Sequence, residues 1–362
     1  MLRKFITGIA LLYSFTTCLA QTAAQQSDSL ILAFMADTQV PGLSISISQK
    51  GKIVYSKGFG FADVARTIKV DPAKTKFRIG SVSKTLTASG LALLYEEGKV
   101  DLDASIDKYV PSWPEKSHKI TLRQLGGHLA GIRHYRGSEF LSAGKFETVT
   151  DGLAIFINDP LEHEPGTKYR YSSYGWNLIS VAMENAAAPA ASFLSSKSFL
   201  QYMQESVFEP LKMNNTVPDH ADQDIENRTD FFSPSNGKVV EAPYVDNSYK
   251  WAGGGFIGTT EDLCRFGQAH MKAGYLKQAT LDEWMTSQKT TDGNETNYGI
   301  GWRTFKRGSG NTFYGHSGGS VGGTTYFLIH KPTETVLAIT GNLNPLNYNG
   351  LQFEIMELFI SQ

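Results

Sequence analysis

The sequence predicts an α/β protein, of the α+β type, in which helices flank one antiparallel sheet built from both ends of the chain. Two pairs of strands predict the sheet, one at residues 43–61 and the other at 326–340, each joined by a short turn. In the long middle of the chain, segments with helical spacing alternate with loops rich in proline and glycine. We therefore expect a sheet domain from residues 27–78 and 296–362, with a mostly helical domain, residues 79–295, inserted into it.

The composition indicates a globular protein. The chain has 362 residues, of which 41% are hydrophobic, enough for a sizeable core and about two domain-sized units. Its formal net charge is -1, and basic and acidic residues are interspersed without a long run of one sign. Binding to a nucleic acid or to an anionic membrane surface would favour a basic patch. We therefore expect no nucleic-acid partner.

Residues 1–20 have the pattern of a secretory signal peptide. Two basic residues precede an apolar run at 5–15, and small residues end the segment at Ala20. From this pattern we expect an exported protein, periplasmic or secreted. Because the apolar run is too short to cross a bilayer, we expect no permanent membrane anchor. Cleavage after Ala20 would remove Cys18 and leave Cys264 alone, which excludes an intrachain disulfide.

The N-terminal part is expected to contribute one helix and one hairpin. A helix is predicted at 28–36, with Ser27 as its N-cap. Residues 43–47 alternate leucine or isoleucine with serine, which is the pattern of a half-buried strand. Lys50 and Gly51 then turn the chain into a second strand at 53–61.

Helical spacing recurs through the middle of the chain, and strands return near its end. The expected helical segments lie at 122–125, 152–157, 177–185, 199–208 and 261–271. Strands at 326–330 and 335–340 form a hairpin around a lysine-proline turn, and a final helix follows at 351–360. We expect the two ends of the chain to share one sheet.

Ser81 is the strongest candidate for a catalytic nucleophile. It precedes a helix whose apolar residues recur at spacings near three and four, with Gly98 just past its end. Lys84 lies three residues further on and on the same helix face, so its amine can reach the serine hydroxyl and act on its proton. The N-terminal end of the helix also favours negative charge at Ser81.

The same Ser-x-x-Lys spacing occurs twice more in contexts that argue against catalysis. Ser235 and Lys238 enclose an Asn-Gly pair that predicts a turn, whereas Ser142 and Lys145 lie in a polar stretch without sustained apolar spacing. An isolated Ser-x-x-Lys usually marks a serine that caps a core helix. The nucleophile hypothesis for Ser81 therefore depends on two further stretches.

Both stretches have the character of functional loops. Residues 165–175 form a turn and then an aromatic, polar loop in front of a helix, with Tyr171 and Ser173 inside it. Taken alone, the tyrosines of this loop are more simply packing aromatics. Residues 314–319 carry glycines on both sides of His316 and Ser317. Glycine lets a backbone approach a ligand closely, and a free N–H there could form half of an oxyanion hole.

Ser317 offers a rival nucleophile, because residues 315–319 match Gly-x-Ser-x-Gly. That motif requires a strand, a sharp turn and a helix, followed by an acid and a histidine. Here a glycine-bearing strand is expected at 321–328, and the only later histidine, His330, follows too closely. A metal site is not expected either, because the remaining histidines lack a metal-binding spacing; these include His118, His128, His134 and His163.

Together, the stretches at 81–84, 171–173 and 316–318 resemble the serine β-lactamase and penicillin-binding-protein superfamily in their order and rough spacing. The match is to the class C branch, which also holds D-Ala-D-Ala carboxypeptidases, esterases and β-lactamase-like peptidases, and it runs from about Val40 to the end of the chain. Residues 131–135 and 249–253 are most similar to the mitochondrial-type β-lactamase-like serine proteases. The resemblance implies a β-lactamase/transpeptidase-like fold and no cofactor.

The resemblance also implies a catalytic mechanism. Ser81 would attack a carbonyl carbon and form an acyl-enzyme, while Lys84 and Tyr171 would share the proton transfers. The backbone N–H groups of Ser81 and Gly319 would form the oxyanion hole. We therefore expect Ser81, Lys84 and Tyr171 to be the catalytic residues.

The resemblance places the substrate beside four residues, namely Ser173, His316, Ser317 and Gly318. Ser173 stands where the family usually has asparagine, and its short hydroxyl cannot replace an amide that reaches the substrate carbonyl. His316 stands where many members have lysine. Since its reference pKa is about 6.5 and a nearby Lys84 would lower it, we expect His316 to be neutral at pH 7 and to gain charge toward pH 6. Both departures argue against β-lactam hydrolysis but not against acyl-serine chemistry.

We therefore expect an exported serine hydrolase that cleaves an amide or an ester in a small-molecule, peptide or peptide-like substrate. The alternative is a non-catalytic penicillin- or peptide-binding or scaffold module on the same fold. The presence of Ser81, Lys84 and Tyr171 argues against that alternative, because a protein that only binds needs no nucleophile.

Overall fold

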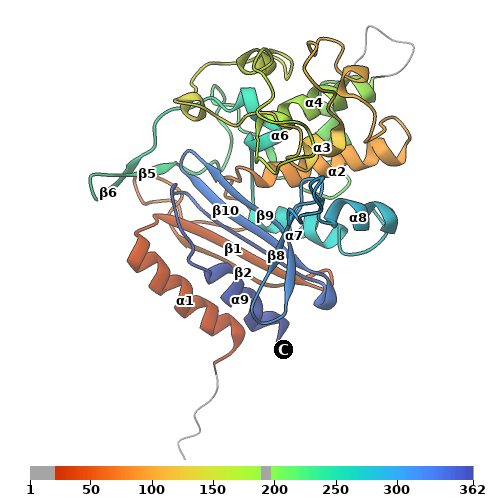
Figure 1. Cartoon of the computed structure of the whole chain (residues 1–362). Helices are drawn as coiled ribbons and strands as arrows, with labels where there is room; N and C mark the ends of the chain where they lie inside the picture. The colour runs from red at the N-terminus through yellow and green to blue at the C-terminus, as the bar shows by residue number, and fades with distance from the viewer. Residues whose placement is uncertain (1–20, 189–196, 362) are drawn as a thin grey trace, which may run out of the picture.

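The computed structural model describes residues 21–188 and 197–361, and its central element is a six-stranded sheet, which Figure 1 shows. The strands lie in the order β2-β1-β11-β10-β9-β8, with antiparallel neighbours. Their bounds are β1 Gly42–Gln49, β2 Lys52–Gly60, β8 Arg303–Lys306, β9 Thr312–Ser320, β10 Gly323–His330 and β11 Thr335–Gly341. Strands β1 and β11 pair from Leu43 opposite Gly341 to Gln49 opposite Thr335. The predicted sheet built from both ends of the chain is confirmed.

Alternate residues of the sheet pack into two hydrophobic cores, one on each face. Helices α1 and α9 cover one face, where Leu43 and Ile45 are buried, and they lie below the sheet in Figure 1. Helix α7 covers the other face, against Val336 and Phe327. The bounds of these helices are α1 Ala23–Thr38, α7 Thr260–Ala269 and α9 Leu351–Ile360. The sheet is therefore a middle layer, and the final helix lies where the sequence predicts it.

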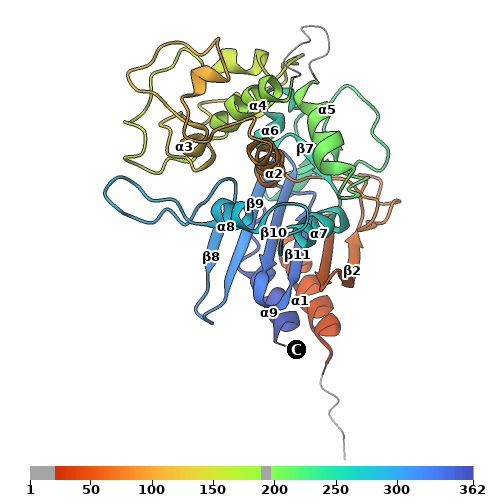
Figure 2. The ribbon, with the colours of Figure 1, turned by 90° about the vertical axis from the view of Figure 1, so that its right-hand side faces the viewer.

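The remaining helices gather above the sheet, around α2 (Val82–Glu96) (Figures 1 and 2). Residues 82–92 of α2 are all buried, and its polar side chains find partners there. The Thr85 hydroxyl donates to the carbonyl oxygen of Gly301 at 2.9 Å, for example. Gly98 follows the helix with a φ of 69°, as predicted for a residue that ends it. The other helices are α3 Leu122–Gly126, α4 Tyr174–Ala187, α5 Phe199–Met203, α6 Trp251–Gly254 and α8 Gln278–Met285.

Short elements connect these helices. Single helical turns lie at Ile106–Lys108, Glu139–Leu141, Asp151–Ile155, Gln204–Phe208, Ser248–Lys250 and Lys331–Thr333. A three-stranded sheet contains β3 Phe77–Arg78, β7 Phe256–Gly258 and β4 Val217–Pro218, and a separate hairpin contains β5 Phe232–Ser235 and β6 Lys238–Glu241. Asn236 and Gly237 turn that hairpin with positive φ angles. The turn predicted between Ser235 and Lys238 is confirmed.

The prediction of a half-buried strand at residues 43–47 is wrong, because β1 is buried on both faces. Its serines face α7 and form hydrogen bonds there. The hydroxyls of Ser44 and Ser46 each lie 2.8 Å from the hydroxyl of Thr260, at the start of that helix. Since a small hydroxyl with a partner can be buried at little cost, alternation of polar and apolar residues did not distinguish solvent from a covering helix.

The first helix is longer than predicted. It begins at Ala23, and the hydroxyl of Thr22 accepts a hydrogen bond from the Gln25 backbone N–H as its N-cap. Ser27, the predicted N-cap, lies within the helix and donates to the Ala23 carbonyl oxygen at 2.8 Å. Residues 23–26, which are two alanines and two glutamines, carry no large apolar side chain, so their pattern did not reveal this first turn.

Two of the sequence predictions fall outside what the structure tests. Residues 1–20, the predicted signal peptide with Cys18, lie outside the described residues. The division of the chain at residues 79 and 295 also stays a prediction. Within the described ranges, no helix is long and apolar enough to cross a membrane. Cys264 is buried and forms no disulfide with any described residue.

Candidate active site

Ser81 lies where the N-terminal end of α2 meets β9 and α6, and glycines make this close approach possible. A Cβ atom on Gly80 would lie 2.6 Å from the carbonyl oxygen of Gly319, and one on Gly318 would lie 1.9 Å from that of Ile79. The φ of Gly80, 51°, is in the left-handed region that favours glycine. Strand β9 was missed as a strand because its glycines have low strand propensity. They serve the close backbone approach instead.

Lys84 is fully buried one turn further along α2 and has three hydrogen-bond partners. Its Nζ lies 3.0 Å from Ser81 Oγ and 3.0 Å from Ser173 Oγ. The third partner is the carbonyl oxygen of Gly253, at 2.5 Å. The fold thus brings the Ser81–Lys84 pair within hydrogen-bond distance, and it adds Ser173 from a loop that is remote in sequence.

The pKa of Lys84 is well below its usual value, because the amine is buried and because Lys250 places a positive charge nearby. A neutral amine has two N–H donors and one lone pair. The Gly253 carbonyl can only accept, so it takes one N–H, and the Ser173 hydroxyl can accept the other. The lone pair is then free to face the hydroxyl of Ser81, which is what a general base requires.

Tyr171 lies against both residues of this pair. Its hydroxyl is hydrogen bonded to Ser81, and the Lys84 Nζ lies 5.1 Å from the centroid of its ring. Burial raises the pKa of Tyr171, so the phenol keeps its proton at neutral pH. Tyr171 is therefore suited to relay a proton, and Lys84 is the better candidate for the base.

Three neutral histidines surround the ring of Tyr171. The centroid of His128 lies 4.3 Å from that ring, and the centroids of His134 and His316 lie at 5.5 and 6.2 Å. His134 Nδ1 accepts from the backbone N–H of Ser173 at 3.2 Å. Burial and then the Lys84 charge lower the pKa of His134 to about 4 and that of His128 well below its usual value. At neutral pH, none of these imidazoles contributes a positive charge.

His316 is buried, and both of its ring nitrogens are bonded within the protein. Nδ1 donates to the carbonyl oxygen of Ser317 at 2.6 Å, so Nε2 accepts from the hydroxyl of Tyr298 at 2.8 Å. Burial, and then the charge of Lys84, lower the pKa of His316 to about 3. The expectation that His316 gains charge toward pH 6 is therefore wrong. No local pattern in the sequence indicates the burial of His316 or its contact with the Tyr298 hydroxyl.

The part of β9 next to Ser81 has an open edge. Strand β8 pairs with residues 312–315 of β9, and no described strand pairs with residues 316–320 on that side. Among the described residues, none accepts a hydrogen bond from the backbone N–H of Ser81. The backbone of Gly319 lies against Gly80, which precedes Ser81. Ser81 and Gly319 are therefore placed next to each other, as the predicted oxyanion hole requires.

Ser317 lies within β9, opposite Tyr326 of β10. A nucleophile elbow needs a strand that ends in a sharp turn before a helix, whereas β9 continues to Ser320 and then pairs with β10 as a hairpin. The rejection of Ser317 as a nucleophile agrees with this geometry. No described cluster of histidine, cysteine, aspartate or glutamate is arranged to hold a metal ion.

A cavity of about 250 Å³ opens beside Ser81. It is lined by Ser81, His134, Tyr135, Phe140, Ser173, Lys250, Gly253, Gly254 and Gly319. Three of the predicted site residues are in this lining, and Lys84 and Tyr171 lie against Ser81 from outside it. His316, Ser317 and Gly318 do not line the cavity.

Tyr135, Phe140 and Lys250 also line this cavity, and none of them was predicted as a site residue. Lys250 ends a single helical turn, and its signal in the sequence is a lysine between two aromatic residues and ahead of three glycines. The segment that carries Phe140 is fixed by Arg133, whose guanidinium binds both carboxylate oxygens of Glu139 at 2.7 and 2.9 Å. These residues are far apart in sequence, so spacing alone could not bring them together.

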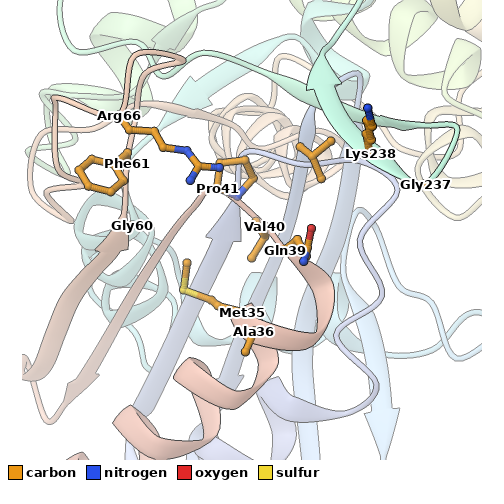
Figure 3. Close-up of a pocket in the computed structure, with 11 residues that line it drawn as sticks. Met35, Ala36, Gln39, Val40, Pro41, Gly60, Phe61, Arg66, Gly237 and Lys238 are labelled. Carbon is orange, nitrogen blue, oxygen red and sulfur yellow. The ribbon is translucent and has the colours of Figure 1, made fainter.

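A larger cavity, of about 700 Å³, lies away from Ser81 (Figure 3). It is formed by the C-terminal end of α1, the loop after β2 and the β5–β6 hairpin. Arg66 extends over it toward Pro41, and Lys238 lies at the hairpin, as Figure 3 shows. Its lining holds no serine, cysteine or histidine. The smaller cavity, with a nucleophile and a base beside it, is therefore the candidate active site.

The fold and the Ser81 site define a class that comparison with known proteins identifies. The model of the beta-lactamase family matches residues 28–352, so the chain belongs to that family. Its fold is that of the serine β-lactamase and penicillin-binding-protein superfamily, and the chain is a serine hydrolase of that superfamily. The expected fold and superfamily are confirmed.

Individual relatives agree with this assignment. The chain is 31% identical to the human mitochondrial serine beta-lactamase-like protein LACTB, over 88% of this chain and 74% of that protein. It is similar to the octameric penicillin-binding protein homologue of Pyrococcus abyssi, with a TM-score of 0.79 and 23% identity, over 93% of this chain and 77% of the other. A D-stereospecific amidohydrolase from Streptomyces has a TM-score of 0.78 at 22% identity, over 95% of this chain and 100% of the other.

Proposed function

We propose that this protein forms an acyl-enzyme on Ser81 and cleaves the amide or ester bond of a peptide or peptide-like substrate. One observation carries the proposal. The Nζ of Lys84 lies 3.0 Å from Ser81 Oγ in a fully buried position that lowers the pKa of this amine. Such an amine can take a proton at neutral pH, and a serine hydroxyl becomes a good nucleophile when a neighbouring base removes its proton.

In the acylation step, Ser81 Oγ forms a bond to the substrate carbonyl carbon while its proton passes to Lys84 Nζ. The electron pair of the carbonyl moves to its oxygen, where the N–H groups of Ser81 and Gly319 stabilise the negative charge. The bond to the leaving group then breaks, and the leaving group receives the proton from Lys84 through the hydroxyl of Tyr171. Water repeats the same steps on the acyl-enzyme and releases the acid.

The alternative that the sequence left open is a protein that only binds its ligand. Three features of the site argue against it: the lowered pKa of Lys84, its hydrogen bond to Ser81 and the contact of Tyr171 with Ser81. Binding alone requires none of them. Burying an amine without an acidic partner is costly. Such a cost is common where a residue must act as a base.

A fluorophosphonate probe tests the proposal directly. We expect it to add its mass to Ser81 in the wild-type protein and to fail on Ser81→Ala, as measured by intact-protein and peptide mass spectrometry. Ser142→Ala and Ser235→Ala are matched controls, since both serines begin the same Ser-x-x-Lys spacing elsewhere. They should label like the wild type. Full labelling of Ser81→Ala would remove Ser81 from the mechanism.

We also propose that the protein is exported, to a periplasm or out of the cell. The support is the pattern of residues 1–20, where two basic residues precede an apolar run and small residues. N-terminal sequencing of the protein recovered from cell fractions tests this. We expect the mature protein to begin at Gln21, and an intact N-terminus on cytoplasmic protein would contradict export.

A further inference from the structure

We infer that Lys250 binds a carboxylate of the substrate, so that the hydrolase proposed above, on which this inference rests, prefers acidic substrates. The carboxylate belongs either to an acidic side chain next to the scissile bond or to the terminal carboxylate of the leaving group. Both sources present the same chemistry to the lysine, and the experiment below separates them.

Lys250 is buried in the wall of the cavity beside Ser81. Its side chain is 2% exposed. Its Nζ is one of the buried polar atoms without a hydrogen-bond partner among the described residues. Buried polar groups are nearly always hydrogen bonded, and an unpaired one is costly. An amine of this kind, at the wall of a cavity next to a nucleophile, is suited to bind an acceptor on a ligand.

Aromatic rings stabilise the amine in place of hydrogen bonds. The Nζ of Lys250 lies 4.5 Å from the ring centroid of Phe140, 5.0 Å from that of Tyr249 and 5.6 Å from that of Tyr135. The negative faces of such rings attract a cation but accept no conventional hydrogen bond. The three N–H donors of the charged amine therefore stay available for a ligand.

The surrounding charges leave this cation unneutralised. The charge of Asp219 acts on Lys250, but that carboxylate is already bound by Arg78 at 2.6 Å and by the Asn247 side chain at 2.8 Å. Lys84, the neutral base proposed above, supplies no negative charge either, and the charge of Lys250 helps to lower the pKa of Lys84. A ligand carboxylate would supply the missing negative charge.

The other groups around the cavity cannot take this role. His134 lines the cavity and is neutral, with a pKa lowered to about 4 by burial and by Lys84. The carboxylate of Glu139, on the adjacent segment, is bound by Arg133. His316, which stands where many family members have lysine, is neutral and has both ring nitrogens occupied.

Burial and then the charge of Arg78 lower the pKa of Lys250 to about 7, although the charge of Asp219 acts in the opposite direction. Roughly half of the amines are then charged at pH 7. A bound carboxylate favours the charged form. The preference for an acidic substrate should therefore be greatest below pH 7 and decline as the pH rises above it.

Matched pairs of peptides test the inference. The first pair is acetyl-Ala-Glu and acetyl-Ala-Gln, each linked to the same fluorogenic amine, in both L and D series. The second pair is acetyl-Ala-Ala-Ala with a free or an amidated C-terminus. Each compound competes with a fluorophosphonate for Ser81, which measures binding even when turnover is slow, and kcat/KM is measured where turnover is detected.

In one of the two pairs, we expect the member with the carboxylate to bind about ten- to one-hundredfold better than the member with the amide. This factor is the contribution of one charge-assisted hydrogen bond. A preference within the first pair would identify a side-chain carboxylate as the ligand of Lys250, and a preference within the second pair would identify a terminal carboxylate. Lys250→Met should abolish this preference, whereas Lys250→Arg should retain part of it. Because the ratio is taken within each variant, any change in Lys84 cancels. Lys57→Met, which removes a charge from β2, should leave the ratio unchanged.

Two results would overturn the inference. The first is equal binding of the acidic and amide members of both pairs by the wild type. The second is a preference that survives in Lys250→Met. Either result leaves the proposed acyl-enzyme standing if Ser81 still labels, whereas a wild-type protein whose Ser81 does not react with the fluorophosphonate fails the proposed function itself.

Discussion

Two buried lysines lie beside the same cavity, and their surroundings differ in one respect. Lys84, on α2, has hydrogen bonds to Ser81, Ser173 and the carbonyl oxygen of Gly253. Lys250, ahead of α6, has aromatic rings around it and no hydrogen bond to any described residue. Burial lowers the pKa of both amines.

The difference indicates two uses of the same chemical group. Hydrogen bonds fix the orientation of the Lys84 amine, so its lone pair can face the Ser81 hydroxyl, and fixed orientation is what proton transfer needs. An amine without protein partners, such as Lys250, can give all of its donors to a ligand. The predictions below test whether the first lysine serves the reaction and the second serves binding.

The largest effect is expected from Lys84→Met, which keeps the length of the side chain and removes the base. Turnover of any substrate should fall by about four orders of magnitude, the upper end of the range for lost general base catalysis. Steady-state kinetics and circular dichroism measure activity and folding together. Lys76→Met is the matched control, because Lys76 is also buried but donates to the Glu226 carbonyl oxygen outside the cavity. A folded, active Lys84→Met would contradict the role of this base.

A somewhat smaller effect is expected from Tyr171→Phe. This change keeps the ring beside Lys84 and removes the hydroxyl that bonds to Ser81. Turnover should fall by about two to four orders of magnitude, since the proton relay to the leaving group is lost. Substrates with a more acidic leaving group should lose less, because they need less help from a proton. An unchanged kcat would make Tyr171 a packing residue.

The smallest effect concerns stability and comes from Lys250→Met. The pKa of Lys250 is about 7 in the folded protein and about 10.4 in the unfolded chain. Between these values the unfolded chain binds a proton that the folded protein does not, so stability rises with pH across this window. Below pH 7 the folded protein carries the full cost of the buried charge. Methionine removes that cost.

We therefore expect Lys250→Met to raise Tm by about 2 to 5 °C at pH 6 and by much less near pH 10. Thermal unfolding followed by circular dichroism at the two pH values measures this. Lys57→Met, on an exposed part of β2, should show no such pH dependence. An equal gain at both pH values would show that the effect comes from packing and not from the charge.

Much of the architecture could be predicted from local patterns. Alternating residues predicted the hairpins at both ends, and apolar spacing with Gly98 predicted α2, since these depend on residues close in sequence. The errors have physical causes. The serines of β1 were expected to face solvent, but α7 covers them. Strand β9 was missed because its glycines meet residues 79–81, which no local pattern reveals.

Three motifs in fixed order in the sequence predicted the family, which the family comparison confirms, and they predicted the combination of Ser81, Lys84 and Tyr171. That Lys250 has no hydrogen-bond partner among the described residues, and that His316 is buried, became apparent from the folded structure. Lys250 and Ser81 are 169 residues apart by their numbers, and both line one cavity. Hydrogen bonding, burial and the pKa values that follow from them depend on neighbours in space, and the folded chain alone supplies those neighbours.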